Sequence, residues 1–297
     1  MASLTPRVVY VVRETDYELL LARHATRQQA RFFLDTRGQD LATLEAGHSR
    51  FQQALQMARS SAPEDWRQTV VKRAELDRFL FAPDDIIVAL GQDGLVANVA
   101  KYLDGQPVLG VNPEPDQYDG VLLQVPMSRV GSALLACAAG AADFQLRTMA
   151  EGVLDTGARL LALNELFVGH RSHQSARYQI EFEGVSERQS SSGLIVSTGT
   201  GATGWARSIM EAIHFAVSLS PDEAALGYFV REPFPSVSTG TTLRAGKVAT
   251  SALRIRSQMN EGGVIFADGI EQDFLSFDWG RELVVEVSAK QLKLVRA

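Results

Sequence analysis

The sequence contains a single cysteine, Cys137, among its 297 residues. One cysteine excludes an intrachain disulfide, and it also excludes a zinc site built on a cysteine cluster. Cys137 lies in a run of small and apolar residues at positions 134–139. Such surroundings favour a buried hydrophobic role over that of a nucleophile.

Long apolar runs and an excess of positive charge are also missing. No apolar run approaches the roughly 18 residues that cross a bilayer, and the N-terminal residues lack the layout of a signal peptide. Lys and Arg total 29 against 35 Asp and Glu, which gives a net charge of −6. We therefore expect a cytoplasmic protein whose main partner is neither a membrane nor a nucleic acid.

The first third of the chain does contain a strand–helix–strand pattern. The apolar runs at residues 8–12 and 86–90 are typical of strands buried on both faces, and residues 107–112 predict the next strand. Residues 16–60 predict helix, broken near Gly38 and Gly47, and residues 95–103 predict another helix. This order is typical of a βαβ unit in a parallel sheet.

The pattern changes after residue 119. Short runs punctuated by Gly, Asn, Ser and Asp predict strands at residues 121–125, 146–154, 159–168, 176–182 and 194–198. Few convincing helices lie between them. The second part of the chain therefore favours an antiparallel β domain.

The turn Gly91-Gln92-Asp93-Gly94 joins a predicted strand to the start of a predicted helix. The free N–H groups of a helix N-terminus attract anions, and glycines let the backbone approach a phosphate. A carboxylate beside phosphates costs electrostatic energy, so its presence calls for a specific role. It can hold Mg²⁺, accept a hydroxyl proton, or simply cap the helix.

A second glycine-rich loop, residues 197–204, reads Ser-Thr-Gly-Thr-Gly-Ala-Thr-Gly and follows a predicted strand. Its glycines match the G-x-G-x-x-G spacing of dinucleotide-binding folds. The surrounding chain is rich in β-structure, however, and Asp222 follows a turn rather than a strand. We therefore interpret the loop as one whose hydroxyl and N–H groups hold phosphate or ribose oxygens.

Three further polar features are open to more than one interpretation. Asn164-Glu165 interrupts an apolar run, so one of the two side chains needs a buried partner, either a ligand or protein. Asp268-Gly269 follows a predicted strand and is an ordinary turn signal. His170 and His173 have the spacing of metal ligands but lie in a polar turn, which favours exposure.

In this order, the motifs resemble those of the NAD kinase family. That family has a G-G-D-G turn, an N-E pair, a Thr- and Gly-rich loop and a late D-G turn. This chain has Gly91-Gln92-Asp93-Gly94, Asn164-Glu165, the 197–204 loop followed by Trp205, and Asp268-Gly269. The form of the loop, with Ser191-Ser192-Gly193 before it and Arg231-Glu232-Pro233 after it, is most similar to the mitochondrial-type branch.

The resemblance implies a Rossmann-like α/β domain, a β-sandwich-like domain, and a C-terminus that returns to the first domain. We place these parts at residues 1–122, 123–277 and 278–297. The implied reaction is phosphorylation of the adenosine ribose 2′-hydroxyl of NAD by ATP, with Mg²⁺ carried by ATP and no metal ligand assigned to the protein. A homodimer is also implied.

The resemblance also assigns the site residues. Asp93 would accept the proton of the 2′-hydroxyl and is the implied catalytic residue. The implied nucleotide-binding residues are Gly91, Gly94, Asn164, Glu165, Thr198, Thr200, Gly201, Thr203, Trp205 and Asp268.

Two residues of the catalytic turn depart from the family pattern. Gln92 replaces the second glycine, which would strain the backbone if that position needed a positive φ, and Leu95 replaces a common threonine. Two other hypotheses therefore stay open. One is a catalytically impaired homologue that senses a dinucleotide or nucleotide, and the other is a related kinase that acts on a lipid or sugar hydroxyl.

Overall fold

The computed structural model describes residues 5–116 and 120–296. The chain divides into two compact units. The first comprises the residues up to Gln145 together with those from Lys293 onward, and the second is Leu146–Leu292. The sequence placed the corresponding boundaries near residues 122 and 277. The first unit therefore also holds the segment that follows residue 122.

The first unit is built on a parallel sheet, as its buried apolar runs predicted. The strand order is β2-β1-β3-β4, and every pair in it is parallel. The strands are β1 (Arg7–Val12), β2 (Arg67–Lys72), β3 (Ile86–Leu90) and β4 (Pro107–Val111). All five residues of β3 are buried, which explains why this run shows no polar alternation.

Helices cover the two faces of this sheet. On one face, α3 (Leu41–Ser60) and α5 (Val130–Ala138) contribute Ala58, Val130 and Leu134 to a core shared with β1 and β3. The hydroxyl of Tyr10 donates to the carbonyl of Ala58 at 3.1 Å, which satisfies a buried polar group. On the other face, α4 (Asp93–Ala100) contacts β1, β3 and β4.

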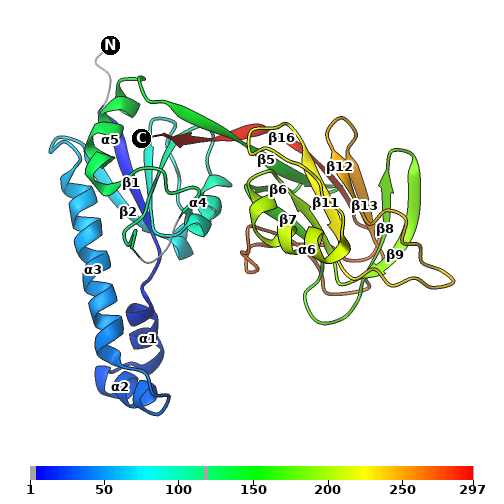
Figure 1. Cartoon of the computed structure of the whole chain (residues 1–297), viewed down its shortest axis with the longest axis horizontal. Helices are drawn as coiled ribbons and strands as arrows, with labels where there is room; N and C mark the ends of the chain where they lie inside the picture. Colours follow the sequence, from blue (N-terminus) through cyan, green and yellow to red (C-terminus); the bar gives the residue numbers. More distant parts are fainter. Residues whose placement is uncertain (1–4, 117–119, 297) are drawn as a thin grey trace. The chain divides into compact units, whose positions relative to one another are not determined.

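The long helical region contains three helices, and Figure 1 shows α1 and α2 beside the N-terminal part of α3. They are α1 (Asp16–His24), α2 (Arg27–Asp35) and α3. The predicted break near Gly38 is confirmed, since Gly38 has φ 66°. The predicted break at Gly47 is wrong, because α3 continues through it. A glycine costs a helix only about 1 kcal/mol, which its other residues offset.

The strand predicted at residues 121–125 is also wrong. The described residues 120–126 form no strand, and η2 (Met127–Arg129) and α5 follow them. The carbonyl of Leu122 packs onto Gly110, where a Cβ would lie 2.0 Å from it. The amide of Val125 donates to the carbonyl of Gly110 at 3.0 Å. These contacts hold the apolar run against β4 without a regular ladder.

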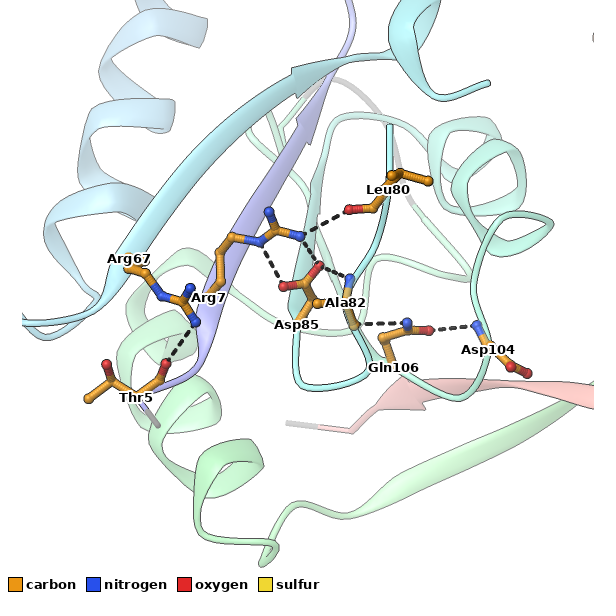
Figure 2. Close-up of polar contacts among 8 residues, drawn as sticks. All are labelled: Thr5, Arg7, Arg67, Leu80, Ala82, Asp85, Asp104 and Gln106. Carbon is orange, nitrogen blue, oxygen red and sulfur yellow. Dashed lines mark hydrogen bonds and ion pairs between the residues drawn. The ribbon is translucent and has the colours of Figure 1, made fainter. Parts of the chain in front are cut away.

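A partly buried ion pair lies at the amino-terminal edge of this sheet (Figure 2). Arg7, the first residue of β1, donates to both carboxylate oxygens of Asp85 at 2.8 and 2.5 Å, and Asp85 is fully buried. Asp85 also accepts the amide of Ala82, whose carbonyl accepts from Gln106. The network lies at the opposite end of β3 from Asp93, so its role is structural.

The second unit contains antiparallel sheets. One ladder holds β16 (Glu282–Val295), β13 (Leu253–Ser257), β8 (Ala176–Phe182) and β9 (Val185–Ser191), with β5 (Phe144–Leu154) and β6 (Arg159–Ala162) attached. The other sheet has the order β12 (Ala245–Val248), β11 (Leu226–Val230), β10 (Leu194–Ser197), β7 (Glu165–His170), β14 (Gly263–Ala267) and β15 (Phe274–Ser276). Side chains of both sheets, such as Tyr178, Leu253, Val196 and Ile265, share one core. The predicted sandwich-like β domain is confirmed.

Helix α6 (Trp205–Ile213) covers the other face of the six-stranded sheet through Ala206 and Ile209. The C-terminal strand β16 starts in the second unit, and its Lys293 and Leu294 pair with Pro107 and Val108 of β4. The predicted return of the C-terminus to the first sheet is therefore confirmed, and Figure 1 shows this strand in red. Within residues 5–116 and 120–296, no helix has the length and hydropathy to cross a membrane.

Candidate functional site

Asp93 begins helix α4 directly after the turn that ends β3. Its carboxylate is already engaged, because one oxygen accepts the amide of Val121 at 2.8 Å and the other that of Leu122 at 2.9 Å. A carboxylate offers about four lone-pair sites, so two amides leave acceptor capacity for a ligand. The side chain is thus fixed in place and half-buried at the carboxyl edge of the parallel sheet.

The backbone of this turn is unstrained. Gln92 has φ −97° and ψ 165°, an extended conformation that any residue adopts, so the strain considered for this position is absent. Gly91 and Gly94 do not have positive φ either. A Cβ on Gly94 would meet no atom within 4 Å, whereas one on Gly91 would lie 3.1 Å from Leu95. Leu95 is a buried core residue of α4.

In the second unit, the Asn164-Glu165 pair lies at a break between two strands. The single strand predicted over residues 159–168 is wrong, since β6 ends at Ala162 and β7 begins at Glu165. The carboxylate of Asp268 causes the break by accepting three consecutive amides, from Leu163 (3.0 Å), Asn164 (2.7 Å) and Glu165 (3.2 Å). Through these three bonds the buried Asp268, whose own φ is 51°, clamps the turn.

Thr198 holds the same turn from its other side. Its amide donates to the carbonyl of Asn164 at 2.9 Å, and its hydroxyl donates to the carbonyl of Leu163 at 2.5 Å. That hydroxyl in turn accepts the amides of Thr200 at 3.1 Å and Gly201 at 3.2 Å. The N-E pair, the Thr- and Gly-rich loop and the late D-G turn are thereby joined in one polar network.

Gly201 is required by this packing. A Cβ at position 201 would lie 2.2 Å from the carbonyl oxygen of Asn164, closer than any real contact. The loop and the turn are therefore in backbone-to-backbone contact. Strand β10 enters the loop from an antiparallel pair with β7, which excludes the Rossmann arrangement for these glycines.

The three threonine hydroxyls of the loop bond within the protein. The hydroxyl of Thr200 accepts from Nη1 of Arg147 at 3.3 Å, and the hydroxyl of Thr203 donates to the carbonyl of Thr200 at 3.1 Å. These bonds give the loop its shape. Contact of Thr198, Thr200 and Thr203 with a ligand stays a prediction, and the exposed end of the loop is at Thr203, Gly204 and Trp205.

Glu165 is the carboxyl group of this network whose pKa is raised by its surroundings. Burial, together with the nearby negative charge of Asp268, raises the pKa of Glu165 to about 7. Within the described residues, neither the Asn164 amide nor the Glu165 carboxylate makes a side-chain hydrogen bond. The protein thus fixes the backbone of the pair and leaves both polar side chains available.

Trp205 forms an aromatic surface next to the loop. Its ring lies nearly parallel to that of Phe167, with centroids 6.1 Å apart, and the Arg231 guanidinium lies 5.1 Å from its centroid. Trp205 remains 36% exposed. Flat, partly exposed rings of this kind stack on planar ligands.

The described part of the chain, residues 5–116 and 120–296, holds no group of three or more His, Cys, Asp or Glu residues able to bind a metal ion. The ring of His170 instead accepts the amide of Ser172 at 3.0 Å. Arg147 was not singled out from the sequence, where it stands between Leu146 and Thr148. In the structure it is a buried cation that donates to the hydroxyl of Thr200.

Known proteins with similar sequences are NAD kinases, although no family model matches the chain. An NAD kinase of Neisseria meningitidis is 32% identical over 167 residues, which cover 51% of this chain and 53% of that protein. The human mitochondrial NAD kinase 2 is 26% identical over 254 residues, covering 68% of this chain and 58% of that protein. The chain therefore spans between half and two thirds of the length of these relatives.

Solved structures show the same fold. A yeast NADH kinase crystallised with NADH has a TM-score of 0.59 at 16% identity, and the match covers 99% of this chain and 84% of that one. An Archaeoglobus fulgidus NAD kinase crystallised with ATP has a TM-score of 0.58 at 18% identity, covering 97% and 93%.

The chain is a homologue of NAD kinases in sequence and has the NAD kinase fold. This similarity confirms the resemblance seen in the sequence. In this NAD kinase homologue the four family motifs separate by unit. The Asp93 turn lies in the first, and the other three motifs meet around the Leu163–Glu165 turn of the second.

Proposed function

We propose that this chain transfers the γ-phosphoryl group of ATP to the adenosine ribose 2′-hydroxyl of NAD, forming NADP and ADP. The observation that carries the proposal is the Asn164-Glu165 turn. Its backbone is held on one side by Asp268 and on the other by Thr198, while its amide and carboxylate side chains stay available. An amide and a carboxylate side by side suit the ring nitrogens and hydroxyls of a nucleoside.

The proposed chemistry needs one proton acceptor. The 2′-hydroxyl would lose its proton to Asp93 as its oxygen bonds to the γ-phosphorus, and the bond to the bridging oxygen of ADP would break. The two amides on Asp93 fix the carboxylate for this step. Such transfer depends mostly on positioning and on charge stabilisation.

Mg²⁺ would neutralise the phosphate charge and would enter with ATP. We also propose a homodimer, which follows from the family alone. Sedimentation velocity over a range of protein concentrations tests it, and a monomer at all concentrations would contradict it.

A direct assay tests the proposed function. Purified protein with ATP, Mg²⁺ and NAD should yield NADP, and Asp93→Asn should lower turnover at least ~100-fold, the lower range for loss of a general base. Asp84→Asn, an exposed carboxylate of the same unit, is the matched control and should leave turnover unchanged.

Other outcomes identify the alternatives. NAD bound in calorimetry without NADP formation would favour the catalytically impaired sensor. Phosphorylation of a lipid or sugar but not of NAD would favour the related kinase. Parallel reactions with polyphosphate as donor and NADH as acceptor define the substrates.

A further inference from the structure

Arg147 is a buried cation beneath the Thr- and Gly-rich loop. It lies on β5 and is only 2% exposed, whereas its neighbour Leu146 is 44% exposed. Removing a charge from water costs several kcal/mol unless hydrogen bonds and opposite charge compensate. The side chain of Arg147 therefore has to be held by specific partners, and the hydroxyl of Thr200 is one of them.

The bond from Arg147 determines how the Thr200 hydroxyl behaves. A hydroxyl has one proton to donate, and a guanidinium can only donate. Because Oγ1 of Thr200 accepts from Nη1 of Arg147 at 3.3 Å, the hydroxyl proton is directed elsewhere. The Thr200 hydroxyl is thus set as a donor, polarised by a charge in a medium of low dielectric constant.

The rest of Thr200 is fixed as well. Its amide donates to the hydroxyl of Thr198, and its carbonyl accepts from the hydroxyl of Thr203. The next residue, Gly201, packs directly on the carbonyl of Asn164. These bonds hold the backbone of Thr200 without Arg147, so loss of Arg147 should change the Thr200 hydroxyl and leave the Asn164-Glu165 turn in place.

We propose that Arg147 is a positioning residue that orients and polarises the Thr200 hydroxyl as a donor, so that the loop recognises the negatively charged diphosphate of a dinucleotide. The inference rests on the proposed function, because it takes NAD as the ligand. It adds to that function a residue that acts on the ligand through the Thr200 hydroxyl and does not contact the ligand directly.

Calorimetric titration of NAD and of uncharged adenosine tests the proposal. Arg147→Met should weaken NAD binding about tenfold or more, the range for loss of a charge-assisted hydrogen bond, and should change adenosine binding far less. Thr200→Val should weaken NAD binding similarly, and Thr200→Ser, which keeps the hydroxyl, should restore it. Arg159→Met on the neighbouring strand, an exposed arginine, should have no effect.

A double-mutant cycle separates positioning from a general structural role. If Arg147 acts through Thr200, the double variant Arg147→Met/Thr200→Val should bind NAD no more weakly than either single variant. Thermal unfolding of each variant establishes whether it is folded. If Arg147→Met does not fold, Thr200→Val and Thr200→Ser decide by the same comparison of NAD with adenosine.

The remaining outcomes overturn the proposal. Unchanged NAD affinity in Arg147→Met or Thr200→Val would contradict it. Equal weakening of NAD and adenosine binding, or additive effects in the double variant, would also contradict it, and none of these results bears on the proposed function. Failure of the unmodified protein to bind NAD would instead contradict both the proposed function and the role of Arg147.

Discussion

Glu165 links the chemistry of the site to the stability of the second unit. Its pKa is raised from 4.5 to about 7 by burial, with Asp268 as the second cause. A carboxyl whose pKa is higher in the folded state binds more protons folded than unfolded between these values. The free energy of unfolding therefore falls as pH rises from about 4.5 to about 7, and stays at the lower level above pH 7.

Glu165→Gln removes the loss of stability that ionisation of the buried carboxyl causes, while it keeps the shape of the side chain. The variant should be more stable than the unmodified protein at pH 8, by an amount on the order of 1–3 kcal/mol, and the difference should vanish near pH 4. Urea unfolding at the two pH values measures it. Glu181→Gln, an exposed position on β8, is the control. A stability gain that is the same at both pH values would contradict the assigned cause.

Gln92 shows where sequence reasoning about single residues reaches its limit. The motif placed Asp93 at the start of a helix correctly, because a strand, a glycine turn and apolar periodicity are local signals. The motif left open whether position 92 needs a positive φ. That depends on how the turn meets residues 121 and 122, which bind Asp93 from 28 and 29 positions away.

At the scale of elements, the break between β6 and β7 organises the candidate site. Residues 159–168 are predicted as one strand, although Asn164-Glu165 interrupts their apolar run, and the structure breaks this strand at Leu163 and Asn164. The break is imposed by Asp268, which lies more than 100 positions later in the chain. The resemblance located Asp268, but its role as a clamp on backbone amides required the fold.

Gly201→Ala tests the contact between loop and turn. A Cβ would lie 2.2 Å from the Asn164 carbonyl and 2.7 Å from the Ser197 hydroxyl, so the loop must move and weaken its bonds through Thr198. We expect a loss of about 1–3 kcal/mol in stability, typical of overpacking, together with weaker NAD binding. Thermal unfolding and NAD titration measure the two effects.

Gly47→Ala is the matched glycine control for that change. Gly47 lies inside α3, where a Cβ meets nothing closer than 3.7 Å. Alanine should stabilise this helix by about 0.5–1 kcal/mol and leave NAD binding as it was. Unchanged NAD affinity in Gly201→Ala would show that the loop is not coupled to the ligand.

At the scale of the whole molecule, the last residues of the chain complete the first unit. Leu294 is fully buried and pairs with Val108 of β4, although β16 begins in the second unit. Composition and periodicity do not predict which strand this segment pairs with. The family resemblance supplied the return to the first sheet, because strand pairing between distant residues leaves no local trace.

Leu294→Ala should therefore destabilise a unit whose other residues lie at the opposite end of the sequence. Loss of a fully buried leucine costs about 2–5 kcal/mol. Hydrogen exchange should show faster exchange of the amides of β3 and β4, while those of β10 and β11 in the second unit stay protected. Lys293→Ala, the exposed neighbour, should change exchange little. If Leu294→Ala leaves β3 and β4 protected, then β4 is stabilised by β3, α4 and α5, and the pairing with β16 contributes nothing measurable to the first unit.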